Sequence, residues 1–322
     1  MQALVVPDAT VRTIAALQWQ DVSAPDPEPD EVLIAVKAVG LNPVDAKLVT
    51  TGNAAWQYPH VLGLDAAGVV VAVGAQVHDF CVGERVCGHG DLAKPGCFAE
   101  LAVAKAAALA PIPAGMAFTT AAACLCAGLT AYQSLYRKAN LAAADSILIH
   151  AGAGGVGSMA IQLAKHAGLR VYTTVSAAKR DFVTQLHPDR IIDYRREDVT
   201  AVIAALTKGL GVDSVMNTIG QPDADLPRLA YNGQLVCVLD LPTAVPANLA
   251  LTVANIDLGG AHRSHNPKQV QALGQMTRAL LALVAAGQVA PMITKTLAFA
   301  DIPQGLEALQ AARVTGKWVA VV

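Results

Sequence analysis

The stretch IHAGAGGVGSMAIQLAK, from Ile149 to Lys165, decides how this sequence can fold. An apolar run ends where the stretch begins, four glycines follow within six residues, and a helix-like run comes after them. Gly152, Gly154 and Gly157 fit the pattern GxGxxG, which is a weak signal when it stands alone. Here the pattern has a strand-like segment before it and a helix-like segment after it, so it predicts a strand, a tight turn and the start of a helix.

Such a turn is suited to holding a pyrophosphate. Glycine lets the backbone come close to the phosphates, and the N-terminus of the following helix offers free N–H groups and a positive dipole end. We therefore expect a dinucleotide to be held by Gly152, Gly154, Gly155, Val156 and Gly157. The alternative is a glycine-rich turn between two packed elements.

The segments around the turn alternate between strand-like and helix-like character. Expected strands cover residues 146–151, 170–175, 190–194, 214–219 and 234–239, and expected helices cover 119–138, 156–167, 179–186 and 198–208. Alternation at this spacing predicts a doubly wound parallel sheet, the Rossmann arrangement.

The first hundred residues have a different pattern, in which β-rich runs such as Glu31–Leu41 and Leu64–Gly74 alternate with turns. They predict a β-rich N-terminal domain. After Asn266 a long helix, a short helix and a closing strand, GKWVAVV, are expected. Periodicity leaves open whether this tail ends the second domain or returns to the first.

Composition and charge exclude several classes of function. The net charge is −2, and neither this charge nor any run of Lys and Arg gives a reason to expect a nucleic acid or an anionic membrane as partner. The uncharged run from Ala106 to Tyr136 is interrupted by Pro111, Pro113 and Gly115, so we expect a buried helix there and no membrane span. The first residues have no signal-like pattern, so we expect a cytoplasmic protein with reduced cysteines.

The type of dinucleotide can be argued from the second strand of the βαβ unit. An NAD site usually carries Asp or Glu at the end of that strand, about 20 residues after the glycines. Here the strand RVYTTV is followed by SAAKR, in which Ser176 and Lys179 replace the acid. A hydroxyl and a cation suit a 2′-phosphate, so we expect NADP(H), although a solvated basic helix start is the alternative.

Several longer motifs carry a resemblance that covers essentially the whole chain. They are VGLNPVDAKL (39–48), LGLDAAGVVVAVG (62–74), VGERV (82–86), AGLTAY (127–132), the glycine turn and the final GKWVAVV. With these motifs in this order, the sequence resembles the zinc-free quinone oxidoreductase branch of the medium-chain dehydrogenase/reductases, and is similar to zeta-crystallin and to enone reductases.

The resemblance implies a GroES-like catalytic domain made of residues 1–117 and 266–322, and a Rossmann cofactor domain made of residues 118–265. It also implies a homodimer joined through an edge strand of the cofactor sheet. The apolar run Gly233–Val253 is a candidate for that edge, or is simply core.

The same resemblance bears on the metal. Zinc-dependent relatives carry a Cys, a His-Glu pair and a third Cys or His around the nicotinamide. The matching positions here are Asn42, the pair Leu64-Asp65, and a place near Cys126. Catalytic zinc normally needs three protein ligands, so we expect no metal.

The implied activity is NADPH-dependent, zinc-independent hydride transfer to a quinone or an α,β-unsaturated carbonyl compound. Two alternatives stay open: a zinc-independent alcohol or ketone oxidoreductase, and an NADPH-binding structural or regulatory protein with little turnover.

The segment NPVDAK supplies three candidate catalytic residues. Asn42 is a candidate donor to a carbonyl or to the nicotinamide ribose, or else a turn residue before proline. Lys47 is a candidate to polarise a carbonyl or move a proton, or else a solvated lysine. Asp45 pairs with Lys47 or the ribose, or is a structural carboxylate.

Three further residues are implied by the resemblance. Thr130 would lie beside the nicotinamide, or bond its own helix backbone. Tyr194 would lie near the 2′-phosphate, or pack in the core. Lys317 would reach the cofactor, or simply flank the closing strand.

Overall fold

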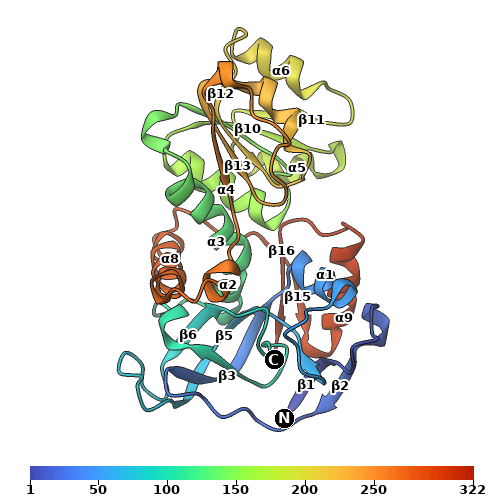
Figure 1. Ribbon diagram of the computed structural model, residues 1–322, viewed down its shortest axis with the longest axis vertical. Helices are drawn as coiled ribbons and strands as arrows, with labels where there is room; N and C mark the ends of the chain where they lie inside the picture. The colour runs from blue at the N-terminus through green and yellow to red at the C-terminus, as the bar shows by residue number, and fades with distance from the viewer. The chain divides into compact units, whose positions relative to one another are not determined.

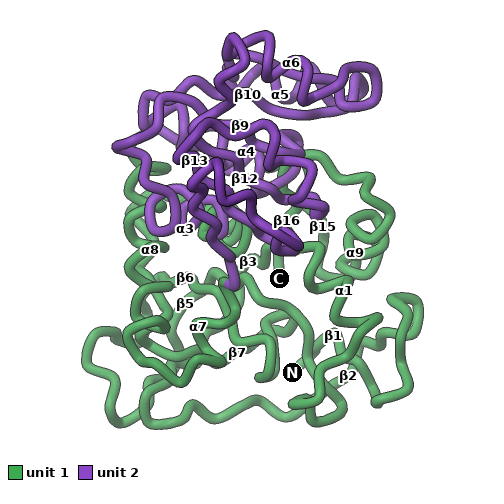
Figure 2. Tube along the Cα trace, turned by 45° about the horizontal axis from the view of Figure 1, so that its top comes forward, with its two compact units in different colours: residues 1–129, 258–286, 293–322 green, residues 130–257, 287–292 purple.

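The computed structural model describes all 322 residues, and the chain divides into two compact units (Figures 1 and 2). Unit 1 consists of residues 1–129, 258–286 and 293–322, and unit 2 consists of residues 130–257 and 287–292. No helix combines the length and the apolar character that a crossing of a membrane requires.

Unit 2 is built on a parallel sheet of six strands in the order β11-β10-β9-β12-β13-β14. The strands are β9 (Ser146–Ile149), β10 (Arg170–Val175), β11 (Arg190–Asp193), β12 (Val212–Asn217), β13 (Leu229–Cys237) and β14 (Thr252–Asn255). The helices that connect them are α4 (Gly155–His166), α5 (Arg180–Thr184) and α6 (Val199–Leu206). The strand order reverses between β9 and β12, and such a switch point is where ligands bind in doubly wound sheets.

The apolar strands of unit 2 explain why its sheet is buried. All four residues of β9 are buried, as expected for a parallel strand that is covered on both faces. Leu148 packs in one cluster with Tyr172, Ile192, Val215 and Leu235 from the neighbouring strands.

Unit 1 contains the β-rich part of the chain. Its seven-stranded sheet has the order β15-β16-β3-β5-β6-β8, with β7 also paired to β3, and a second sheet has the order β2-β1-β4. The strands are β1 (Gln2–Val6), β2 (Gln18–Asp21), β3 (Glu31–Gly40), β4 (His60–Val61), β5 (Asp65–Val73), β6 (Arg85–His89), β7 (Leu101–Lys105), β8 (Leu109–Pro111), β15 (Ile293–Ala298) and β16 (Lys317–Val321). The strands β15 and β16 come from the end of the chain, and β16 pairs antiparallel with β3. Together the two units confirm the predicted fold class, a GroES-like β-rich domain plus a doubly wound parallel sheet.

The helices differ from the sequence expectation in two places. One is α1 (Pro43–Thr51), within a region where only strands and turns were predicted; Asn42 is its N-cap and Pro43 its first residue. The other is the expected helix over residues 119–138, which is divided into α2 (Phe118–Ala123), α3 (Cys126–Gln133) and a π-helical turn over 134–138. The remaining helices are α7 (Gly260–Arg263), α8 (Pro267–Ala285) and α9 (Ile302–Gln310).

Candidate active site

The glycine turn of unit 2 joins β9 to α4, as the sequence predicts. A Cβ atom on Gly152 would lie 2.2 Å from Thr173 Oγ1, and one on Gly157 would lie 2.3 Å from the carbonyl oxygen of Ala151. These two glycines therefore let the turn pack tightly against β10 and α4. A Cβ on Gly154 would meet only the Ala151 carbonyl oxygen, at 3.4 Å, so the space beside Gly154 is open. Open space at the N-terminus of α4 fits a pyrophosphate that approaches the backbone closely.

Ser176 and Tyr194 follow directly on β10 and β11, whose last residues, Val175 and Asp193, are partners in the parallel ladder. The two residues therefore lie at the carboxyl-terminal end of the parallel sheet. Lys179 lies in the turn that follows Ser176, since its backbone N–H donates to the carbonyl oxygen of Ser176, at 3.0 Å. Burial lowers the pKa of the Lys179 ammonium group.

The same end of the sheet also carries a cation, Arg195, that the sequence argument did not use. Tyr194 is 51% exposed, and the guanidinium of Arg195 lies 5.8 Å from the centre of its ring. The carboxylate of Asp193 accepts the backbone N–H of Arg195, at 3.1 Å. A hydroxyl with nearby cations suits a phosphate monoester better than a ribose hydroxyl.

Unit 1 contains a buried polar cluster that consists of Asn42, Asp45, Asp65, His89 and Lys317, each less than 5% exposed. Asp65 is at its centre. One of its oxygens accepts from Asn42 Nδ2, at 2.8 Å, and lies 3.2 Å from Lys317 Nζ. The other oxygen lies 3.1 Å from His89 Nδ1 and accepts the backbone N–H of Cys126, at 2.9 Å.

The cluster is assembled by strand register. Gly40 of β3 pairs with Asp65 of β5, and Asp65 pairs in turn with His89 of β6, so three neighbouring strands bring these residues into one row. Lys317 begins β16, on the other side of β3. The cluster therefore depends on contacts between residues far apart in the chain.

Charge in the cluster is balanced unevenly. Burial alone would raise the pKa of Asp65, but the Lys317 ammonium and the hydrogen bond from His89 hold it below its usual value. Asp45 lacks such compensation: burial and the neighbouring Asp65 charge raise its pKa to about 7. One Asp45 oxygen accepts the backbone N–H of Asn42, at 2.8 Å, and the other has no hydrogen-bond partner.

The structure places the four predicted catalytic residues in different surroundings. Both ends of the Asn42 amide are engaged within the protein, because its oxygen accepts from Lys317 and its nitrogen donates to Asp65. Lys47 is exposed on α1. Thr130 is buried in α3, and its carbonyl oxygen accepts from the Ser134 hydroxyl, at 2.7 Å.

Lys317 was predicted to reach the cofactor or to flank a strand, and its ammonium lies inside the buried cluster. It donates to the Leu41 carbonyl oxygen, at 3.0 Å, and to the Asn42 side chain, at 2.5 Å. Sequence reasoning did not select Asp65 or His89 as site residues. Only the pairing of β5 with β6 would have joined them, and no local motif carries that information.

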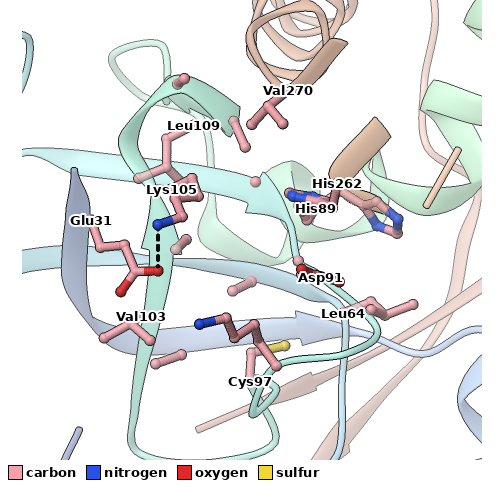
Figure 3. A pocket seen from close by; sticks show the side chains of 18 of the residues that line it. Glu31, Leu64, His89, Asp91, Cys97, Val103, Lys105, Leu109, His262 and Val270 are labelled. Carbon is pink, nitrogen blue, oxygen red and sulfur yellow. Dashed lines mark hydrogen bonds and ion pairs between the residues drawn. The ribbon is translucent and has the colours of Figure 1, made fainter. Parts of the chain in front are cut away.

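A cavity of about 280 Å³ lies within unit 1, and its walls come from this unit alone (Figure 3). His89 and Leu64 line it, so the cavity touches the polar cluster. His262 of α7 also lines it and donates from Nε2 to the carbonyl oxygen of His89, at 3.3 Å.

The acidic and thiol groups do not form a metal site. No group of three or more His, Cys, Asp or Glu side chains is arranged to hold a metal ion. Cys126 is near the place that the resemblance assigns to one zinc ligand of the zinc-dependent relatives, and burial raises the pKa of its thiol.

Comparisons with known proteins cover both units. Residues 28–114 match the family model of the alcohol dehydrogenase GroES-like domain, and residues 155–279 match that of the zinc-binding dehydrogenases. A quinone oxidoreductase of Pseudomonas aeruginosa is 32% identical over 315 residues, which cover 94% of each chain. The erythronolide synthase EryA2 of Saccharopolyspora erythraea is 33% identical over 98% of this chain, which spans only 9% of that synthase.

A solved structure shows the same arrangement. The quinone oxidoreductase of Pseudomonas syringae pv. Tomato DC3000 is 29% identical and superposes with a TM-score of 0.88, over 100% of this chain and 99% of the other. Full-length similarity in sequence and structure, together with both family models, shows that the chain belongs to the quinone oxidoreductase branch of the medium-chain dehydrogenase/reductase superfamily.

Proposed function

We propose that this protein is an NADPH-dependent, zinc-independent reductase of quinones or α,β-unsaturated carbonyl compounds. The observation that carries the proposal is the position of the Lys317 ammonium, which is bonded to Asn42 and Asp65. By resemblance, Asn42 stands where the zinc-dependent relatives have one zinc ligand. Asp65 belongs to the pair Leu64-Asp65, which stands where those relatives have a His-Glu pair. The Lys317 ammonium, held by these two residues, is incompatible with a metal ion in the same place.

The acceptor class follows from the chemistry that remains. Without a metal, an alcohol or a simple ketone has nothing obvious in the site to activate it. A quinone or an enone needs less activation, because conjugation spreads the negative charge that develops on its oxygen. When bound, the reduced nicotinamide supplies a hydride to such an acceptor.

The residues proposed to hold NADPH all lie in unit 2. The backbone of residues 152–157 would hold the pyrophosphate, and Gly154 is the position where the space is open. Ser176, Lys179 and Tyr194 would contact the 2′-phosphate, with Arg195 as an additional cation.

We assign different roles to the other expected site residues. Asn42 and Asp45 organise the buried cluster, since their hydrogen bonds are to Lys317, Asp65 and each other. Lys47 stays a candidate for contact with the acceptor because its side chain is exposed. Thr130 stays a candidate for contact with the nicotinamide.

We also propose that the protein is a homodimer joined at β14. This strand is the last in the six-stranded sheet, and only β13 pairs with it. Three exposed apolar side chains precede it, Leu239, Leu241 and Val245. An unpaired apolar edge is the kind of surface that a second copy covers.

The test is a comparison of cofactors and acceptors in the presence of EDTA. Loss of nicotinamide absorbance is followed with NADPH and separately with NADH, using 1,4-benzoquinone and 3-penten-2-one as acceptors. We expect turnover with NADPH that EDTA does not reduce. Lys179→Ala should raise KM for NADPH about tenfold and leave KM for NADH unchanged, since one charge-assisted bond to phosphate is lost. Lys208→Ala, which removes another lysine of unit 2, is the matched control.

Other outcomes would reject parts of the proposal. Preference of the wild type for NADH would reject the assignment of Ser176 and Lys179. Tight NADPH binding without turnover of either acceptor would favour a structural or regulatory role.

A further inference from the structure

The cavity of unit 1 has two unlike ends (Figure 3). The imidazoles of His89 and His262 are at one end, and the pair of Glu31 and Lys105 is at the other. The rest of the lining includes the aliphatic side chains of Ile34, Leu64, Ala66, Val103, Leu109 and Val270, together with the polar side chains of Asp91, Lys94 and Asn266. A ligand here would be held by apolar contacts along its length and by polar contacts at its ends.

The size of the cavity limits the ligand. Its volume of about 280 Å³ is small for a ligand pocket. A single ring with a short substituent fits this volume.

The charged end of the cavity disfavours an anion. Lys105 is one cation there, and its ammonium lies 2.8 Å from Glu28, 2.7 Å from Asp30 and 3.2 Å from Glu31. Lys94 also lines the cavity, and its ammonium lies 3.3 Å from Glu28. Three carboxylates against two ammonium groups leave a local excess of one negative charge. The cavity is therefore suited to a neutral ligand.

The histidine end can exchange a proton with a ligand. His89 is 3% exposed and lines the cavity. Its Nδ1 is held by Asp65, and its main-chain carbonyl oxygen is held by His262. Since Asp65 engages Nδ1, Nε2 is the ring nitrogen left to act on a ligand, an arrangement by which histidines give and take protons.

We propose that this cavity binds the neutral carbonyl acceptor, and that His89 gives from Nε2 the proton that completes its reduction, with Asp65 as a positioning residue. This inference rests on the proposed function. Once the acceptor has received a hydride, its oxygen carries one negative charge, as an enolate from an enone or a hydroquinone anion from a quinone. The Nε2–H bond of protonated His89 breaks and an O–H bond forms. This gives the hydroquinone from a quinone, or from an enone an enol that tautomerises to the saturated ketone, and the neutral imidazole regains a proton from water.

The first experiment measures binding and needs no turnover. The probe is 4-nitrophenol, a small aromatic hydroxyl compound whose absorbance distinguishes phenol from phenolate. We expect it to bind the wild type and to lose its proton at a lower pH than in water, because His89 donates to its oxygen. His89→Gln should weaken binding about tenfold, the loss of one hydrogen bond to a charged group, and should abolish this shift. His78→Gln, which changes an exposed histidine of unit 1 outside this cavity, is the control.

The second experiment separates proton donation from a structural role. Rates of NADPH oxidation are compared for 3-penten-2-one, which forms a basic enolate, and for 2,6-dichloro-1,4-benzoquinone, whose anion is only weakly basic. His89→Gln should lower the enone rate about 100-fold and the dichloroquinone rate less than about fivefold, after subtraction of the uncatalysed reaction. Asp65→Asn should change the ratio of the two rates in the same direction.

A third variant tests the cavity without changing His89. Val270→Phe should fill the aliphatic part and prevent binding of the probe, while NADPH binding is retained. Equal losses with both acceptors in His89→Gln, or unchanged probe binding in either variant, would overturn the inference. If the wild type binds the probe but reduces no acceptor, the proposed function is at fault and the cavity assignment stands.

Discussion

Asp45 is a buried carboxyl group whose pKa, raised to about 7 by burial and by the charge of Asp65, lies far above its usual value of 3.8. Between these two values the folded chain holds a proton that the unfolded chain releases. The free energy of unfolding therefore falls as the pH rises through this window, and Asp45 destabilises the fold above it.

Asp45→Asn removes this titration and keeps an oxygen that can accept from the Asn42 backbone. We expect the stability of the variant relative to the wild type to increase by about 2–3 kcal/mol between pH 5 and pH 8. Denaturant unfolding at the two pH values measures this difference. Asp26→Asn, at an exposed position, should show no such change, and parallel stabilities for Asp45→Asn and wild type would contradict the assignment.

Some residues of the site could be predicted from sequence and others could not, for a physical reason. Asn42 and Asp45 lie in one local motif, so their membership of a site could be inferred. Their bonds could not, because the partners Asp65, His89 and Lys317 come from strands whose pairing depends on the register of the whole sheet.

Elements with a strong local pattern were predicted well. The strand expected over residues 170–175 has those bounds in β10, and α4 begins within one residue of its expected start. The helix expected over 119–138 is interrupted because the backbone N–H of Cys126 donates to Asp65. Asp65 is 61 residues away from Cys126 in the chain, so a local helical pattern cannot reveal this contact.

The turn between β9 and α4 gives a prediction about this element, because its glycines differ in surroundings. Gly157→Ala would force a Cβ to within 2.3 Å of the Ala151 carbonyl oxygen, so we expect a loss of stability of about 1–3 kcal/mol or more. Gly154→Ala meets no atom closer than 3.4 Å and should fold with nearly the stability of the wild type. It should nevertheless bind NADPH at least about tenfold more weakly, since its methyl group occupies the space of the pyrophosphate.

Thermal unfolding and fluorescence of bound NADPH measure the two effects separately. Each variant thus serves as the control for the other. If Gly154→Ala bound NADPH as tightly as the wild type, the open space beside this residue would not be the phosphate site.

At the scale of the whole molecule, the path of the chain could not be read from periodicity. The final strand β16 is an apolar run, WVAV, after Lys317, and this pattern would suit either sheet. Its pairing with β15 and β3 is set by long-range packing. Through this pairing the C-terminal segment belongs to unit 1. The sequence pattern predicted that the strand exists, and only the resemblance to a family indicated that the tail returns to the N-terminal domain.

The proposed dimer is the last consequence at this scale. The edge strand β14 has an unpaired side, and the side chains of Leu241 and Val245, just before it, are 53% and 44% exposed. In a two-fold symmetric interface each residue recurs on the partner, so a new charge appears twice. We expect Leu241→Lys combined with Val245→Lys to convert a dimer into a monomer of 33.2 kDa, because charged side chains block pairing at strand edges. Sedimentation velocity at micromolar concentration measures the mass.

Leu210→Lys changes a leucine of unit 2 that is 76% exposed, between α6 and β12, and should leave the dimer intact. A wild type that sediments as a monomer, or a double variant that remains dimeric, would place the contact between copies elsewhere on the molecule or remove it altogether.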